Sequence, residues 1–249
     1  MGSVDRSLIM RISISGTAGQ GKTTLIESFL EKWDMYTTPK SSYRELIKGD
    51  NHSKRTNRET QWNILNYMID DIQTYSEDDN VVLDRCPLDN LIYSMWCYHK
   101  GGSDIDEIFI EKCIPVVRES MTLLDIIFFI PLTNVTTEEK EDDSRETDSE
   151  YVGEIDNFFK AMHKNWMSGD ARFFPKEDRA AMIEIFGTTE ERISMIGLYL
   201  NDAGDEYGED ESLVDTNTLV DEFGMKMDDG NITRPTKEDV DSISSHRYE

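Results

Sequence analysis

Residues 16–23 have the types and spacing that bind phosphate, since they satisfy the pattern G-x-x-x-x-G-K-[ST]. The glycines allow a tight turn whose backbone N–H groups point at phosphate oxygens, and the helix expected from Lys22 favours an anion at its N-terminus. We expect a nucleoside triphosphate site, in which Lys22 reaches the β- and γ-phosphates and the Thr23 hydroxyl binds Mg²⁺. The residues of this ATP-type site are Gly16, Thr17, Ala18, Gly19, Gln20, Gly21, Lys22, Thr23 and Thr24.

A second pair of residues suited to this chemistry, Asp84 and Arg85, stands at the end of the apolar segment 80–84. Strand ends of a parallel sheet meet the ligand, so we expect Asp84 beside the phosphate loop, holding the metal or orienting the attacking oxygen. Arg85 presents a bidentate cation to an acceptor phosphate or to the transferred phosphoryl group. Asp89 and Asn90 are expected to cap the helix that follows.

Other classes of phosphate-loop protein lack support in the sequence. No N-K-x-D element, which a GTPase uses to read guanine, follows in the later half of the chain. The segment 80–84 does not end in the paired acids of a motor ATPase, because Asp84 is followed at once by Arg85.

The elements that must position these residues alternate in kind along the chain. Apolar segments typical of buried parallel strands occur at residues 10–15, 34–39, 80–84, 124–132 and 181–186. Helical spacing of apolar residues occurs at 22–33, 57–75, 105–121, 149–166 and 188–202. This alternation predicts an α/β fold: a doubly wound, five-stranded parallel sheet of order 2-3-1-4-5 with helices on both faces.

Composition sets the boundaries and the surroundings. We expect an N-terminal extension at residues 1–9, one domain at 10–202, and an acidic C-terminal appendage at 203–249, where Asp and Glu dominate. The formal charge of −25 repels nucleic acid and anionic membranes in general. No apolar run approaches the roughly 20 residues that span a bilayer. Three cysteines without zinc-type spacing, and no secretory signal, predict a cytoplasmic protein with reduced thiols.

The phosphate loop, the motif DRCPLDN at residues 84–90 and the late IFGTTEERI together resemble the thymidylate-kinase-like P-loop kinases. This group includes nucleotide and deoxynucleoside kinases and many virus-encoded relatives, and the resemblance suggests a bacteriophage-type member. It covers roughly residues 10–202. It implies that Arg85 contacts the acceptor nucleotide or its phosphate, and that ATP and Mg²⁺ are the cofactors.

The same resemblance implies two further site elements. Kinases of this group carry a lid that brings arginine onto the ATP phosphates, which places a lid at about 133–150 with Arg145 as its cation. They also place an adenine-contacting loop after the last strand, where Gly187 would permit close approach of the backbone to the base. Thr188 is equally suited to cap the helix that follows.

The acceptor region lies between the first and third strands. Residues 37–61 are notably basic, and from them we predict Lys40, Tyr43 and Arg44, together with Arg85, as substrate-binding residues. Related kinases often carry an acidic residue after the second strand, whereas this chain has Lys40 there. That departure fits an acceptor that already carries phosphate, such as a nucleoside monophosphate, and it also fits a nucleotide within a DNA strand.

The predicted activity is transfer of the γ-phosphoryl group of ATP to a thymidylate-like nucleotide or nucleoside, with Lys22, Asp84, Arg85 and Arg145 as the catalytic residues. One alternative is a kinase of 5-hydroxymethyldeoxyuridine within viral DNA, since some viral members of the group modify DNA in this way. Another is an ATP-binding regulatory or assembly protein. The oligomeric state stays open, with a homodimer as one option, and no membrane partner is expected.

Overall fold

The computed structural model describes residues 10–46, 56–75, 79–133, 149–206, 226–228 and 231–233. Contacts divide the chain into two units, Met1–Glu206 and Tyr207–Glu249. In the second unit, β5 (Lys226–Asp228) pairs antiparallel with β6 (Asn231–Thr233). In the first unit, four parallel strands form a sheet of order β2-β1-β3-β4. They are β1 (Arg11–Gly16), β2 (Val81–Asp84), β3 (Ile126–Ile130) and β4 (Ala181–Glu184).

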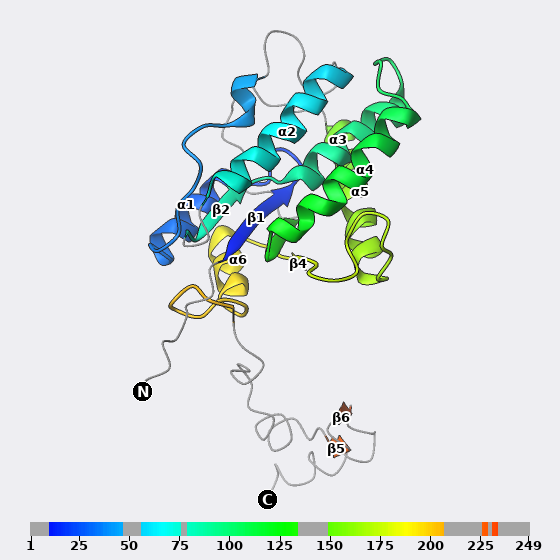
Figure 1. Ribbon diagram of the computed structural model, residues 1–249. Coiled ribbons are helices and arrows are strands. Elements are labelled where there is room, and N and C mark those ends of the chain that lie inside the picture. The colour runs from blue at the N-terminus through cyan, green and yellow to red at the C-terminus, as the bar shows by residue number, and fades with distance from the viewer. Residues whose placement is uncertain are drawn as a thin grey trace, which may run out of the picture. The chain divides into compact units, whose positions relative to one another are not determined.

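Helices cover both faces of this sheet (Figure 1). The α-helices are α1 (Lys22–Lys32), α2 (Arg58–Thr74), α3 (Pro87–Lys100), α4 (Glu107–Ser120), α5 (Ser149–Met167) and α6 (Thr189–Ile196). Short 3₁₀ helices are η1 (Tyr43–Leu46) and η3 (Met121–Leu123). The α/β class, the parallel sheet and the five predicted helical segments are confirmed, although the last helix ends at Ile196 rather than near 202. No helix among the described residues is long and apolar enough to cross a membrane.

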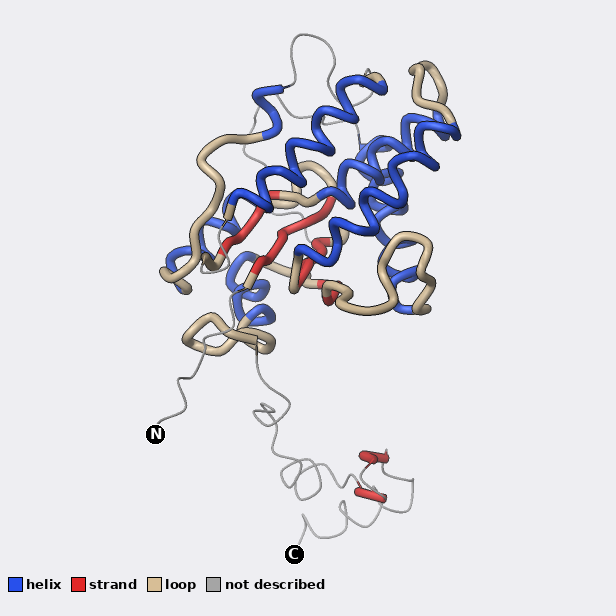
Figure 2. Tube along the Cα trace, in the orientation of Figure 1, coloured by secondary structure: helices blue, strands red, loops and turns tan. Residues whose placement is uncertain are grey.

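The side chains of the strands alternate between two separate cores. Ile12, Ile14 and Phe128 pack in a cluster with α1 and α6. Leu83, Ile127 and Phe129 point the other way and pack with α2, α3, α4 and α5. Because both faces are covered, β3 is apolar at every position, as expected of a buried parallel strand, whereas β1 carries the buried Ser13 and Ser15 between its isoleucines. Figure 2 shows the strands running between the two layers of helices.

The prediction of a fifth strand at 34–39 was wrong. Only Thr37 pairs with the edge of β2, as an isolated parallel bridge to Val81. The Thr37 N–H donates to the carbonyl of Asn80 at 2.9 Å, and its carbonyl accepts from Val82 N–H at 2.9 Å. The next N–H of this ladder would come from residue 39, which is proline and has none. The chain therefore leaves the sheet edge after one bridge and turns into η1.

Candidate active site

The loop between β1 and α1 adopts a conformation that its glycines make accessible. Gly16, Gly19 and Gly21 have φ values of 141°, 75° and 70°. A Cβ on Gly16 would lie 2.6 Å from the carbonyl oxygen of Ile130 in β3, so the strand itself excludes a side chain there. Gly21 is the N-cap of α1, and Thr23 in the first turn of that helix is exposed. The loop and the start of α1 thus form an open cradle of the kind that binds phosphate.

Lys22 lies at the centre of this cradle and is buried, with 6% of its surface exposed. Its Nζ donates a hydrogen bond to the carbonyl oxygen of Thr17 at 2.5 Å. Burial, followed by repulsion from Arg85, lowers the pKa of Lys22 to about 7, against the opposing attraction of Asp84 and Asp89. A phosphate group bound in the loop would place a negative charge beside Lys22 and so favour its charged form.

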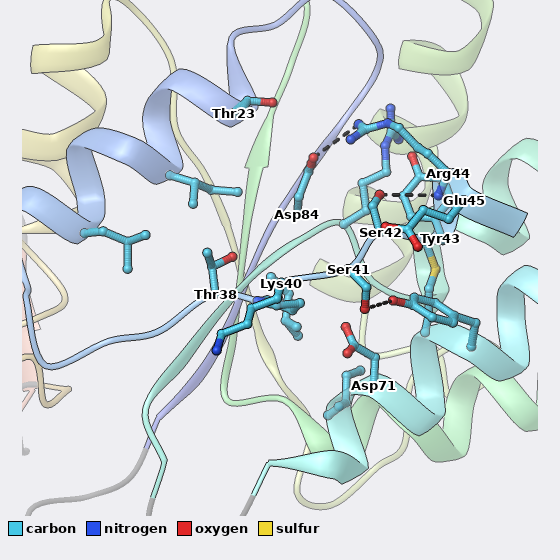
Figure 3. Close-up of a pocket in the computed structure, with 18 of the residues that line it drawn as sticks. Thr23, Thr38, Lys40, Ser41, Ser42, Tyr43, Arg44, Glu45, Asp71 and Asp84 are labelled. Carbon is cyan, nitrogen blue, oxygen red and sulfur yellow. Dashed lines mark hydrogen bonds and ion pairs between the residues drawn. The ribbon is translucent and has the colours of Figure 1, made fainter.

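Asp84 ends β2 at the same edge of the sheet, as expected. Its Oδ2 accepts a hydrogen bond from the guanidinium of Arg44 in η1 at 3.2 Å (Figure 3), while its buried Oδ1 has no hydrogen-bond partner within the part of the chain that the structure describes. Burial raises the pKa of Asp84, but the charges of Lys22, Arg85 and Arg44 outweigh this and lower it overall. The carboxylate is therefore ionised and has one oxygen available.

This arrangement fits Mg²⁺. The unpartnered Oδ1 of Asp84 and the exposed hydroxyl of Thr23 are hard oxygen ligands, which magnesium prefers. Among the described residues, no group of three or more His, Cys, Asp or Glu side chains could hold a metal ion. A magnesium ion at this position would be held by one carboxylate, one hydroxyl, nucleotide phosphates and water.

Arg85 lies beside Asp84 and is held in an uncommon backbone conformation. Its φ of 77° is rare for a residue with a side chain. The guanidinium is buried, donating to Asp89 at 3.1 Å and to the hydroxyl of Tyr93 at 3.0 Å. The Arg85 Nε has no partner among the described residues. The cation is thus fixed in direction and retains one donor.

Asp89 caps α3, as predicted, because its side chain accepts from the backbone N–H of Cys86 in a capping box. Asn90 does not cap the helix. Its side-chain amide donates to Gln61 in α2, at 2.7 Å to Oε1 and 3.2 Å to the backbone carbonyl. Asn90 therefore joins α3 to α2, since the capping position is already satisfied by Cys86 and Asp89.

A pocket of about 340 Å³ opens next to these residues. It brings together all four predicted substrate residues, namely Lys40, Tyr43, Arg44 and Arg85. Thr23, Asp84 and Arg44 lie at one end, and Lys40 and Asp71 lie at the other (Figure 3). The pocket occupies the space beside β2 from which the chain departs at Pro39, so the strand that failed to form leaves room for a ligand.

The remaining predicted residues follow β4 or lie outside the described chain. Gly187 follows β4 with a φ of 88°, and Thr188 caps α6 through a hydrogen bond from Glu191 N–H at 3.3 Å. Arg145 and most of the expected lid, residues 134–148, lie outside the described residues. Arg145 therefore remains a prediction from the sequence.

The contacts of Arg192 and Asp89 with the phosphate loop, or with the strand end before it, were not predicted from the sequence. Arg192 of α6 has 1% of its surface exposed and donates from Nη1 to the carbonyl oxygen of Gln20 at 2.6 Å. Asp89 accepts from the Ser15 hydroxyl at 2.7 Å. A signal for Arg192 existed, because it lies four residues before the apolar Ile196 and so falls on the buried face of its helix.

A family model described as an AAA domain matches residues 11–169. The chain belongs to this AAA domain family. The match runs from β1 through the phosphate loop, the Asp84–Arg85 strand end and α5. No curated protein sequence matches the chain.

Several solved structures share the fold. A deoxyadenosine kinase from M. mycoides, with dCMP and dCDP bound, is 18% identical with a TM-score of 0.55, covering 75% of this chain and 96% of its own. A thymidylate kinase from Candida albicans is 13% identical with a TM-score of 0.55, covering 76% and 89%. The NadR protein in complex with NR is 15% identical with a TM-score of 0.54, covering 76% and 51%. The fold is therefore one that P-loop kinases use.

Proposed function

We propose that this protein is a P-loop kinase that transfers the γ-phosphoryl group of ATP to a nucleotide or nucleoside acceptor. One observation carries the proposal: the phosphate loop and the pocket lined by Lys40, Tyr43, Arg44 and Arg85 meet at a single strand end, Asp84. A donor cradle and a neighbouring pocket are what transfer between two bound molecules requires. The fold likeness to a deoxyadenosine kinase and a thymidylate kinase supports the same reading.

The residues divide the work between donor and acceptor. The loop amides and Lys22 hold the triphosphate, with the Lys22 ammonium turning from the Thr17 carbonyl to the phosphates. Thr23 and Asp84 would hold Mg²⁺, which neutralises charge on the phosphates when bound. Arg85 directs its cation at the acceptor or at the transferred group. Catalysis of this kind is mostly positioning and stabilisation of charge in a loose transition state.

Three cations of the pocket are suited to an acceptor phosphate. Lys40, Arg44 and Arg85 lie in a lining that also holds the carboxylates of Glu27, Glu45, Asp71 and Asp84, so recognition of a phosphate rests on these cations individually and not on the overall charge of the pocket. Arg44 forms an ion pair with Asp84 at 3.2 Å, and an acceptor phosphate would compete with that carboxylate for the guanidinium. A thymidylate-like deoxynucleotide is the acceptor that we propose first. In this proposal the guanidinium of Arg145 covers the phosphates of the bound ATP.

Two alternatives draw on other observations. The same three cations would suit a nucleotide within DNA, such as 5-hydroxymethyldeoxyuridine, although a formal charge of −25 opposes tight DNA binding. Membership of an AAA domain family favours an ATP-binding regulatory or assembly protein as the third candidate. A bacteriophage origin, a cytoplasmic location, a homodimer and an acidic appendage at 203–249 remain predictions from the sequence.

The test is ADP release from magnesium-ATP in the presence of a panel of acceptors. The panel holds nucleosides, their monophosphates, and single- and double-stranded oligonucleotides with and without 5-hydroxymethyldeoxyuridine. We expect stimulation by a free deoxynucleoside monophosphate. The control is Lys22→Ala, which should remain folded by circular dichroism and release no ADP.

Each of the other outcomes favours a different function. Stimulation by modified oligonucleotides alone would favour the DNA kinase. ATP binding without acceptor-dependent turnover would reject the kinase and favour the regulatory protein. Undiminished transfer by the Lys22→Ala variant would overturn the site itself.

A further inference from the structure

Asp89 makes more contacts than a helix cap needs. Its side chain has 1% of its surface exposed. Oδ2 accepts from the Cys86 backbone N–H at 3.1 Å, which is the capping contact, and from the Ser15 hydroxyl at 2.7 Å. Oδ1 accepts from the Arg85 guanidinium at 3.1 Å and from the Gly16 backbone N–H at 3.4 Å.

These contacts connect two parts of the candidate site. Ser15 and Gly16 form the junction of β1 with the phosphate loop, while Arg85 lines the neighbouring pocket. A carboxylate is planar and rigid, so both of its oxygens move together. In a dry interior an ion pair such as Arg85–Asp89 keeps its geometry, because separating the charges leaves each one buried and unpaired.

Arg85 depends on Asp89 for its orientation. The guanidinium donates hydrogen bonds to Asp89 and Tyr93. The backbone of Arg85 has a φ of 77°, which residues with a side chain rarely adopt. The Arg85 backbone N–H also donates to the carbonyl of Ile14 at 3.1 Å. Both ends of Arg85 are therefore attached to β1 near the loop, one directly and one through Asp89.

We propose that Asp89 is a positioning residue that couples nucleotide occupancy of the phosphate loop to the orientation of Arg85. The proposal rests on the proposed function, because it takes Arg85 as the residue that directs the acceptor. Because Oδ1 of Asp89 accepts from both the Gly16 N–H and the Arg85 guanidinium, a change in the hydrogen bonding of Gly16 on nucleotide binding would alter the position of that guanidinium. Donor binding would then prepare the acceptor pocket.

Hydrogen–deuterium exchange with magnesium-ADP as the probe tests this coupling without any acceptor. In the unaltered protein we expect ADP to slow exchange in a peptide covering residues 84–92 by roughly fivefold or more. In Asp89→Asn, ADP should still bind and still slow exchange in the loop, but leave residues 84–92 unchanged. Asparagine keeps the size of the side chain and removes the charge that holds Arg85.

Two further variants separate coupling from lost stability. Val117→Ala truncates a fully buried side chain of α4, and it should keep the ADP response of residues 84–92 despite a lower stability. Ser15→Ala removes one contact and leaves the ion pair, so it gives a reduced response even if Asp89→Asn fails to fold. In turnover with the acceptor that the panel identifies, Asp89→Asn should raise the acceptor KM by a larger factor than the ATP KM.

The outcomes distinguish the two proposals. An ADP response at residues 84–92 that persists in Asp89→Asn, or in Ser15→Ala at full size, overturns the coupling and leaves the kinase intact. Loss of the response in Val117→Ala as well would assign it to stability and also reject the coupling. If the unaltered protein binds no magnesium-ADP, the proposed function fails and the coupling fails with it.

Discussion

The Nζ of Lys22 lies 2.5 Å from the carbonyl oxygen of Thr17, so the lysine of the phosphate loop is hydrogen-bonded inside its own loop. This contact satisfies one donor of a buried cation and spans the loop from its first residues to the start of α1. The contact therefore ties the start of α1 to the first residues of the loop. The remaining cost is electrostatic, because burial and Arg85 both disfavour the charged form.

That cost predicts a pH dependence of stability. The pKa of Lys22 falls from its ordinary value of 10.5 to about 7 on folding, so between these values the unfolded chain binds more protons at this position than the folded one. The free energy of unfolding should therefore rise with pH across this window. Replacing Lys22 by Met removes this contribution. Urea unfolding at about pH 7 and about pH 9 should give a smaller rise for the variant than for the unaltered protein, and equal rises would contradict the assignment.

Arg85→Lys should impair acceptor use and spare ATP. Lysine keeps the charge but cannot reproduce a forked contact, so we expect the acceptor KM to rise by about tenfold or more. The ATP KM should stay within about twofold, because Arg85 lines the pocket rather than the loop. Steady-state kinetics with each substrate varied in turn measures both constants.

A matched control exists in Arg11→Lys. Arg11 begins β1, at the end of the strand away from the loop, and donates to the carbonyl of Tyr75. The Arg11→Lys variant should keep the ATP KM and the acceptor KM of the unaltered protein. Equal losses for ATP and acceptor in Arg85→Lys would move Arg85 to the donor side.

The sequence predicted those parts of the site that lie within one stretch of chain. The motif from Gly16 to Thr23 joins a strand to a helix, and both follow from the same short segment. The pairing of Asp84 with the loop followed from a general rule about strand ends. The parallel register of β1 with β2, in which Ile14 is opposite Asp84, is what brings them together.

Contacts between distant residues could not be predicted in this way. Asp89 fits a local cap, and nothing nearby reveals that Ser15, 74 positions earlier, donates to the same oxygen. Arg192 contacts Gln20 across 172 positions. The fifth strand was predicted wrongly for a different reason. The prediction relied on the apolar pattern at 34–39, but Pro39 has no N–H to donate to the neighbouring strand, and this matters only once that strand is known to be β2.

Gly16 and Gly19 should differ sharply in their tolerance of alanine. In Gly16→Ala the new Cβ would lie 2.6 Å from a backbone carbonyl of β3, which cannot move without disturbing the sheet. We expect a loss of about 3 kcal/mol or more. In Gly19→Ala the new Cβ meets nothing within 4 Å, so only the left-handed backbone is penalised, by about 1 kcal/mol. Urea denaturation gives both free energies, and similar losses would show that the loop is not fixed against β3.

Arg192→Lys should weaken nucleotide binding through its effect on the loop backbone. Its guanidinium donates to the carbonyl oxygen of Gln20 at 2.6 Å and fixes the loop next to Gly21, the N-cap of α1. A lysine at this buried position cannot reproduce the hydrogen bond to the Gln20 carbonyl with the same geometry. The loop would then become ordered only when the nucleotide binds, which reduces the free energy of binding. Calorimetry with magnesium-ADP should give a dissociation constant about tenfold higher. Arg179→Lys is the control, because its guanidinium holds the carbonyl of Trp166 away from the loop and its loss should leave ADP affinity unchanged. Unaltered affinity in Arg192→Lys would mean that the loop keeps its shape without α6.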